Sequence, residues 1–345
     1  MKTAVLIEPN RIEIQDRTVP DPGPQEVLIR VRAVGICGSD THYFAGKRDH
    51  EDSTVYPFVL GHEFSGEVAK TGANVSGVEE GARVGCAPDR PCGQCEWCQK
   101  GEENVCPNVQ FAASGGIPGC LSEYYVVHQS QLHPLSPNIG FGEATLAEPL
   151  AIGLHIIDNL VQPRGNETFA IIGAGPIGLV TTFAARLRGE HAVIYTSDRL
   201  SERIAAAETF GASETCLVTD RDFSDFVLDK TSGRGADVVV EAAGEKQPID
   251  QVAGMASIHG TAIVEGIPPA GHVKFDVDSA RRRELKVIFG RRSLHKTDEA
   301  LALVADGQFP SDAMITHEFS LEETQEAFET TRDYSDGVIK AIIHP

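Results

Sequence analysis

The sequence predicts an α/β protein that combines an irregular β domain with a doubly wound parallel sheet. Three observations lead to this fold class: a length of 345 residues, a change of pattern near Leu150, and a glycine-rich turn that begins at Gly173. A chain of this length usually divides into two domains. Short apolar runs separated by turn residues precede Leu150, whereas strand-like and helix-like segments alternate after it.

The first part of the chain is expected to form short strands. Residues 27–34 are rich in β-branched side chains and partly alternate, and residues 67–69 follow a glycine. Prolines and glycines are frequent at residues 20–24 and 115–119, where they favour turns. These segments together predict an irregular β domain.

The second part is expected to form six strands joined by helices. The predicted strands cover residues 168–172, 192–195, 214–218, 237–241, 261–265 and 286–289, and the predicted helices cover 177–187, 200–210 and 248–256. Such alternation builds a parallel sheet with helices on its faces. It stops after Gly290, so we expect residues 291–345 to return to a first domain of residues 1–149, with 150–290 as the second.

The net charge of −20 excludes some classes of partner. An acidic chain repels nucleic-acid phosphates and anionic membrane surfaces, so we expect neither as a partner. Acidic residues number 50, and arginines outnumber lysines by 20 to 10. A lysine-poor acidic surface suits concentrated salt, and it equally suits an ordinary acidic cytosolic protein. The first apolar run is too short for a signal peptide and residues 169–185 are too few to span a bilayer, which predicts a cytoplasmic protein.

Four of the eight cysteines gather in one short segment, at Cys92, Cys95, Cys98 and Cys106. Four thiolates at this spacing suit a closed tetrahedral zinc site with a structural role. Two disulfides and an iron–sulfur cluster are the alternatives. In a cytosolic enzyme, cysteines at such spacing are more often metal ligands than disulfides, so we favour the metal.

A dinucleotide-binding turn is predicted directly after the strand 168–172. The motif G-x-G-x-x-G consists of Gly173, Gly175 and Gly178, with Pro176 and Ile177 opening the next helix. Such glycines allow the turn, the approach of a pyrophosphate and close helix packing, while the helix N-terminus faces the phosphates.

Asp198 lies just after the end of the second predicted strand, 25 residues after Gly173. A carboxylate there would accept hydrogen bonds from the adenosine ribose and repel a 2′-phosphate, which favours NAD over NADP. Arg199 and Arg203 could instead pair with that phosphate. We interpret both arginines as part of a solvated helix face and keep NADP as the alternative.

A second metal site is indicated outside the cysteine segment. Cys37, His62, Glu63 and Glu148 are zinc-ligand types, and a catalytic zinc takes about three protein ligands and keeps one position open. Taken singly, each residue also has a structural interpretation: a buried thiol, a core histidine or a surface acid. Spacing alone does not decide between these interpretations.

The motifs described above occur together, and in the same order, in a known enzyme family. The chain resembles the zinc-dependent medium-chain dehydrogenases, the superfamily of alcohol, polyol and threonine dehydrogenases. Gly61-His62-Glu63-x-x-Gly66, followed by Gly72 and Val75, matches the family's zinc signature, and the cysteine segment and glycine motif follow in the family's order. The resemblance covers the whole chain. It implies a GroES-like catalytic domain formed by both chain ends and an inserted Rossmann domain.

The resemblance also implies roles for individual residues. Cys37 and His62 would bind the catalytic zinc, with Glu63 or Glu148 as the third ligand. Ser39, Glu148 or a water would accept the proton of the substrate hydroxyl, and His42 would pass it outward. Further residues of the substrate pocket would be Tyr43, Phe111, Ser114 and Arg291.

Residues 37–43 look closer to sorbitol and xylitol dehydrogenases than to threonine dehydrogenases, although Arg292 stands where polyol dehydrogenases usually carry a tyrosine. We therefore expect two zinc ions per chain, NAD, a polyol, sugar or other alcohol as substrate, and a homodimer or homotetramer. A threonine 3-dehydrogenase or a sugar 1-dehydrogenase is the alternative within the enzymes. A non-catalytic dinucleotide-binding redox sensor or structural protein is the alternative of another class, and Cys37, His62 and Glu148 argue against it because such a protein needs no open metal site.

Overall fold

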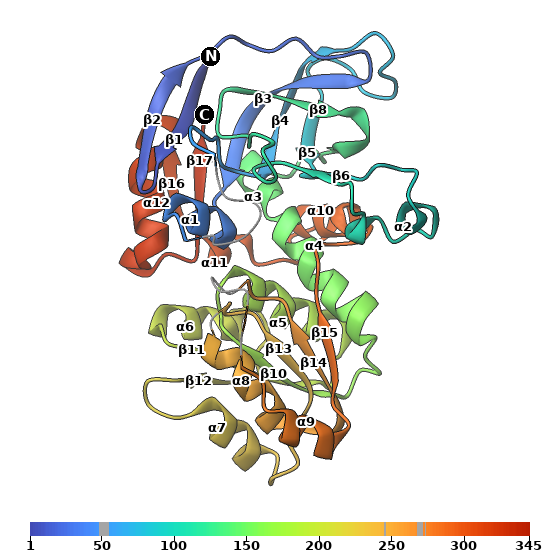
Figure 1. Ribbon diagram of the computed structural model, residues 1–345, viewed down its shortest axis with the longest axis vertical. Helices are drawn as coiled ribbons and strands as arrows, with labels where there is room; N and C mark the ends of the chain where they lie inside the picture. Colours follow the sequence, from blue (N-terminus) through green and yellow to red (C-terminus); the bar gives the residue numbers. More distant parts are fainter. Residues whose placement is uncertain (48–54, 245, 268–271, 273) are drawn as a thin grey trace. The chain divides into compact units, whose positions relative to one another are not determined.

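The computed structural model describes residues 1–47, 55–244, 246–267, 272 and 274–345 (Figure 1). The chain forms two compact units, one of residues 1–148 with 297–345 and one of residues 149–296. We call them the catalytic unit and the nucleotide unit. The domain limits expected from the sequence, 149/150 and 290/291, remain predictions about independently folding parts.

The nucleotide unit contains six parallel strands in the order β12-β11-β10-β13-β14-β15. The strands are β10 (Thr168–Ile172), β11 (Val193–Asp198), β12 (Glu214–Leu217), β13 (Ala236–Glu241), β14 (Ala256–Val264) and β15 (Lys286–Phe289). Because the order reverses at β10, the carboxyl ends of β10 and its neighbours mark the place where sheets of this kind bind ligands. The predicted doubly wound sheet is confirmed.

Five helices connect these strands: α5 (Pro176–Arg188), α6 (Ser201–Thr209), α7 (Phe223–Lys230), α8 (Lys246–Met255) and α9 (Val277–Arg283). The sequence patterns predicted α5, α6 and α8 but not α7 or α9. Strand β14 begins five residues before its predicted start at Thr261. Its first half is irregular, since His259 has a positive φ and the pairing with β13 shifts register there, and this irregularity hides the alternation.

The catalytic unit is organised around the ten-residue strand β3 (Glu26–Gly35). A seven-stranded sheet runs β16-β17-β3-β4-β5-β9, and β8 also pairs with β3. The other strands are β4 (Glu63–Thr71), β5 (Arg83–Cys86), β8 (Tyr124–His128), β9 (Leu132–Pro134), β16 (Ile315–Ser320) and β17 (Lys340–His344). Strand β17 pairs with β3, so the last part of the chain completes a sheet that the first part began.

Two small hairpins and several helices complete this unit. The hairpins are β1 (Lys2–Glu8) with β2 (Arg11–Asp16) and β6 (Asp89–Arg90) with β7 (Gln110–Phe111). The helices are α1 (Gly38–Phe44), α2 (Glu96–Gln99), α3 (Phe141–Thr145), α10 (Thr297–Ala305), α11 (Ser311–Met314) and α12 (Thr324–Asp333). Buried side chains of β3, β4 and β17 form its core, among them Ile29, Val31, Val34, Phe64 and Ile343.

The helical stretch Phe141–Val161 has the length and apolar composition of a membrane span. It comprises α3, α4 (Ala147–His155) and a π-helical turn (Ile156–Val161). Within this stretch, 67% of an apolar window of 18 residues is buried, which identifies a core helix.

Candidate metal and active sites

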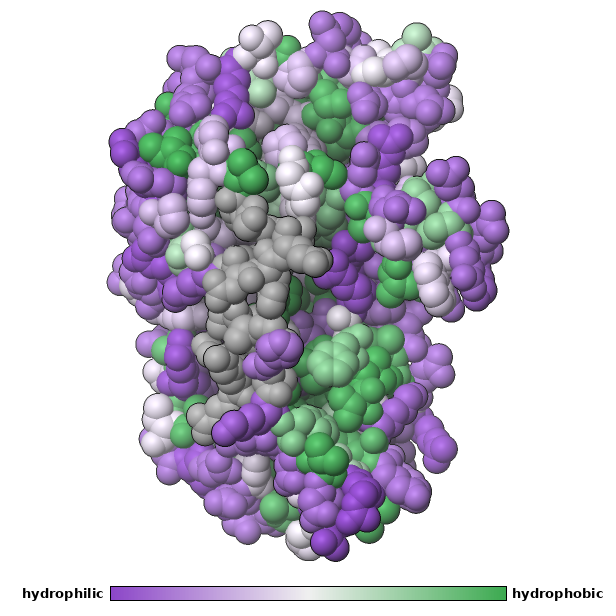
Figure 2. Space-filling model, in the orientation of Figure 1, coloured by the Kyte–Doolittle hydropathy of each residue, from purple (hydrophilic) through white to green (hydrophobic). Residues whose placement is uncertain are grey.

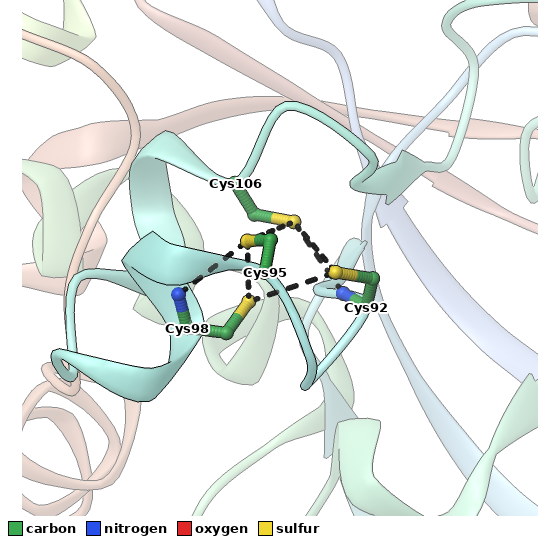
Figure 3. Close-up of side chains that lie close together, drawn as sticks. All are labelled: Cys92, Cys95, Cys98 and Cys106. Carbon is green, nitrogen blue, oxygen red and sulfur yellow. Dashed lines mark hydrogen bonds between the residues drawn. The ribbon is translucent and has the colours of Figure 1, made fainter.

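The four clustered cysteines surround one point on the loop between β6 and β7 (Figure 3). The Sγ–Sγ distances are 3.4 Å for Cys95–Cys98, 3.6 Å for Cys92–Cys106, 3.7 Å for Cys95–Cys106 and 4.0 Å for Cys92–Cys98. A tetrahedral zinc with bonds of about 2.3 Å places its sulfur ligands roughly 3.8 Å apart. The four residues therefore fit a single tetrahedral ion.

The same distances decide against both alternatives for these cysteines. A disulfide would bring two sulfurs to about 2.05 Å, and all eight cysteines are free thiols. An iron–sulfur cluster would distribute the four thiolates over more than one iron. Four sulfurs around one centre leave no open coordination position, so this site has a structural role.

The four thiols differ in their electrostatic surroundings. Backbone N–H groups of Gln94 and Cys95 lower the pKa of Cys92 to about 6. Burial raises the pKa of Cys98 to about 12. Since zinc binds thiolates, the ion itself must offset the cost of ionising Cys98.

A second group of possible ligands lies where β3 leads into α1 and where β4 begins. One ligand atom each from Cys37, His62 and Glu63 lies within 4.8 Å of the others. Cys37 precedes the first residue of α1, and Glu63 is the first residue of β4. His62 and Glu63 are buried, whereas Cys37 is half-buried. The donor set of sulfur, imidazole and carboxylate is that of a catalytic zinc with one open position.

Asp40 holds His62 in place. Its carboxylate lies 3.4 Å from Nδ1 of His62 and 3.3 Å from the N–H groups of Cys37 and Gly61. Burial lowers the pKa of His62, but the charges of Asp40 and Cys37 outweigh burial and hold that pKa well above its usual value. With Nδ1 facing Asp40, Nε2 is the nitrogen left for a metal.

Lys340 of β17 meets Glu63 across β3. Its Nζ donates to both carboxylate oxygens, at 2.8 and 2.7 Å, and to the carbonyl oxygen of Ile36 at 3.0 Å. Burial lowers the pKa of Lys340, but the charge and hydrogen bonds of Glu63, together with the charges of Cys37 and Glu148, raise this pKa by more. The pair can meet because Gly35 lies between them: a Cβ there would be 2.3 Å from Oε2 of Glu63.

Glu148, the second residue of α4, lies near this group without belonging to it. Burial raises the pKa of Glu148 to about 7, and the charges of His62 and Lys340 oppose this while Glu63 adds to it. The three residues brought closest together are therefore Cys37, His62 and Glu63.

Of the predicted proton-relay and pocket residues, three lie on or beside the metal-binding region and one is buried in the core. Ser39 and His42 are both partly buried on α1 and three positions apart, so they share one face of the helix. The ring of Phe111 lies 5.3 Å from the ring of His62. Tyr43 is only 3% exposed and packs on Phe58 in the core, which leaves little of it for a substrate.

The two remaining pocket candidates lie in different units. Ser114 forms a bridge with Ile117 in the loop after β7. Arg291 follows β15 in the nucleotide unit and is exposed.

The glycine motif forms the turn between β10 and α5. Gly173 has a φ of +93°, and a Cβ at Gly178 would lie 1.7 Å from the carbonyl oxygen of Gly173, so neither position accepts a side chain. Pro176 and Ile177 are the first two residues of α5, where the missing N–H of proline costs nothing.

Asp198 and two arginines surround this turn. Asp198 Oδ2 accepts the N–H of Ala174 at 2.8 Å, and Oδ1 accepts the N–H of Leu200 at 3.0 Å. Each oxygen keeps a lone pair for a further donor. The guanidinium of Arg203 lies against Gly175, with Nη1 3.3 Å from the position of a Cβ there, whereas Arg199 is exposed.

Two residues near the metal ligands were missed by the sequence analysis, Asp40 and Lys340. Asp40 lies three residues after Cys37, and an acid so close to a predicted ligand is a recognisable sequence signal for a residue that supports the metal site. The structure adds that Asp40 is fully buried. Lys340 interrupts the apolar run 338–343, where a charge implies a buried partner. Sequence spacing does not identify that partner.

Comparisons with known proteins agree with this geometry. Residues 23–137 match the alcohol dehydrogenase GroES-like domain, and residues 176–306 match the zinc-binding dehydrogenase family. The chain is 32% identical to a sorbitol dehydrogenase of Bacillus subtilis over 345 residues, covering 100% of this chain and 97% of the relative.

Two solved structures share the whole fold. An Escherichia coli oxidoreductase of unknown specificity involved in membrane biogenesis superposes with a TM-score of 0.93 at 31% identity, covering 99% of this chain and 98% of the other. A putative zinc-binding dehydrogenase of Sinorhizobium meliloti bound to NADP gives 0.90 at 31% identity, covering 100% and 99%. The chain thus belongs to the zinc-dependent medium-chain dehydrogenases, NAD(P)-dependent oxidoreductases that act on the CH–OH groups of alcohols and polyols.

Proposed function

We propose that this protein oxidises a secondary hydroxyl of a polyol or sugar with NAD, using two zinc ions per chain, one catalytic and one structural. The observation that carries the proposal is the group formed by Cys37, His62 and Glu63. It offers three different donors and leaves a coordination position for a substrate. The similarity to a sorbitol dehydrogenase supports the polyol class.

In this proposal the residues around the metal position and orient the reactants. A bound zinc would supply Lewis acidity that lowers the pKa of the substrate hydroxyl, and NAD would accept the hydride. Asp40 fixes the ring of His62, and Lys340 holds the carboxylate of Glu63. Glu63 is the candidate third ligand because its atoms lie with the other two, and Glu148 is the candidate that replaces it during turnover.

The proton of the hydroxyl would leave along α1. Ser39 is the proposed acceptor, and His42, on the same helix face, would pass the proton outward. Ser39→Ala and His42→Ala should then lower kcat more than they raise KM. Unchanged kcat in both variants would leave Glu148 or a water as the acceptor.

For the cofactor we propose NAD, held at the glycine turn with its ribose on Asp198. The negative charge of Asp198 disfavours the 2′-phosphate of NADP. Arg203, beside Gly175, is close enough to the turn to pair with a cofactor phosphate. Because the Sinorhizobium meliloti structure contains NADP, kcat/KM should be measured with both cofactors; equal values would overturn this preference.

We also propose that two copies associate through β15, the edge strand of the nucleotide unit. Phe289 on this strand is 70% exposed and Ile258 on β14 is 71% exposed, and Figure 2 shows apolar residues gathered over this region. An open apolar strand edge invites pairing with another copy. Light scattering of Phe289→Lys should show a smaller species than the wild type, and an unchanged mass would exclude this contact.

A substrate screen tests the function as a whole. Polyols, sugars, simple alcohols and threonine should be assayed with NAD and NADP. Turnover highest with a polyol supports the proposal, and turnover highest with threonine or an aldose sugar selects the alternative enzyme. Cofactor binding without any turnover by protein that holds two zinc ions would favour a non-catalytic role.

A further inference from the structure

A cavity of about 390 Å³ lies in the catalytic unit. Strand β1, the segment after β2, the start of β3, the β6–β7 hairpin and β8 contribute to its wall. The lining includes none of Cys37, His62, Glu63 or Glu148. Its volume falls in the range of small-ligand sites, about 300–1,000 Å³.

The β6–β7 hairpin separates this cavity from the metal ligands. Asp89 pairs with Phe111, and Arg90 pairs with Gln110. Cross-strand partners share one face of a hairpin, and successive residues alternate between faces. Phe111 packs on His62, whereas Arg90 and Gln110 line the cavity. The cavity is therefore a separate site behind the hairpin.

The charges of the lining are opposite to those of the chain. The lining contains two guanidinium groups, those of Arg17 and Arg90, and one carboxylate, that of Glu26, in a protein that carries 50 acidic and 30 basic residues. Glu26 already accepts the N–H of Gly23 at 2.9 Å. Among the described residues, Arg90 has no side-chain hydrogen bond or ion pair. Guanidinium groups stay charged at any physiological pH, so the lining has a surplus of positive charge.

The remaining wall supplies a neutral donor and apolar surface. Nδ1 of His128 accepts the N–H of Ser130 at 3.2 Å, so the neutral ring carries its proton on Nε2. Burial and the charge of Arg90 lower the pKa of His128, which favours that neutral form. Tyr124 and Tyr125 provide apolar surface, and the hydroxyl of Tyr125 is fixed by the carbonyl of Pro118 at 2.9 Å.

We propose that this cavity binds a compact organic anion, a carboxylate or a phosphate ester, through Arg17 and Arg90. Guanidinium groups bind both kinds of oxyanion by paired hydrogen bonds. The tyrosines would cover the uncharged part of the ligand. Binding at this site needs no turnover, so its test is independent of the proposed function.

Titration of the full-length, zinc-loaded protein tests this proposal. The probes are succinate and methyl phosphate at constant ionic strength, with succinamide as the uncharged control; none of the three carries an alcohol hydroxyl. Saturating NADH fills the cofactor's own phosphate-binding turn. We expect saturable binding of at least one anion by calorimetry and none of succinamide; whichever anion binds identifies the charged group.

Substitutions then locate the site. Arg17→Gln and Arg90→Gln should each weaken binding by about tenfold or more, because each removes a charge-assisted hydrogen-bonding partner. Arg281→Gln, which removes an exposed arginine of α9, is the matched control and should bind like the wild type.

Two results would overturn the proposal. In the first, the wild type binds neither anion; if the cavity variants then also change the molecular mass in light scattering, the cavity is an interface between copies of the chain. In the second, both cavity variants bind the anion as tightly as the wild type.

Discussion

The two metal sites of the catalytic unit differ in how their ligands are supplied. The structural site takes all its ligands, Cys92, Cys95, Cys98 and Cys106, from one loop of 15 residues. The Sγ–Sγ distances between them are similar, from 3.4 to 4.0 Å. The catalytic site takes Cys37 from just after β3 and His62 and Glu63 from where β4 begins, and the buried charges of Asp40 and Lys340 lie beside them. We infer that the structural ion orders its own loop, whereas the catalytic ion binds between elements that the fold has already positioned.

The largest effect is expected from the structural site. Cys98→Ala should remove one of two zinc ions and lower the thermal unfolding temperature strongly, because such sites contribute on the order of 10 kcal/mol to local folding. Metal analysis and calorimetry check this. Cys216→Ala, which changes a buried cysteine of the nucleotide unit, is the control and should retain both ions. Two ions and normal stability in Cys98→Ala would contradict the structural role.

A substitution at the catalytic site should abolish most of the activity and change the stability little, the opposite of what is expected for the structural site. Cys37→Ala should lower kcat/KM by about a thousandfold or more, since a Lewis acid supplies several kcal/mol of transition-state stabilisation. Its unfolding temperature should stay within a few degrees of the wild type. Steady-state kinetics and calorimetry check both expectations. Residual turnover near the wild-type rate would remove Cys37 from the mechanism.

Lys340→Met is expected to destabilise the protein by about 3–5 kcal/mol, because it leaves the carboxylate of Glu63 buried without its partner. Denaturant unfolding should be measured with and without zinc. If Glu63 is a zinc ligand, the loss is smaller in the zinc-loaded protein. Equal losses would point to Glu148 as the third ligand, and Glu63→Gln should then retain the catalytic zinc.

Asp40→Asn should produce the smallest effect. It weakens the hold on His62 and is expected to lower zinc affinity at the catalytic site by about 10–100-fold, leaving the cysteine site unchanged. Competition with a chelator measures both affinities. Asp298→Asn is the matched control, since Asp298 forms an exposed pair with Nδ1 of His133 at 2.6 Å. Equal losses in both variants would mean that the effect on zinc is not specific to His62.

Much of the nucleotide unit could be predicted from local pattern. The limits of β10 and β15 agree with the predicted ones, because both are short apolar runs bounded by turn residues. Helices α7 and α9 were missed, since seven or eight residues with several charges give little periodicity. The π-helical turn after α4 was also missed, because its hydrogen bonding depends on packing.

The two metal sites also differ in how far local sequence predicts them. The cysteine site could be predicted because all its ligands lie within 15 residues of sequence. For Cys37, His62 and Glu63, spacing alone left the structural interpretations open, and the family resemblance was needed. Lys340 lies 277 positions from Glu63, and only the pairing of β17 with β3 brings the two together.

The alternation of side chains in the β6–β7 hairpin restricts which mutations this protein can accept during evolution. Because successive residues point to opposite sides, an insertion or deletion that shifts the strands by one position would exchange Arg90 and Gln110 with Asp89 and Phe111. Such a shift would put a cation beside His62 and an acid into the cavity. Only substitutions, one position at a time, allow the two sides of this hairpin to diverge independently.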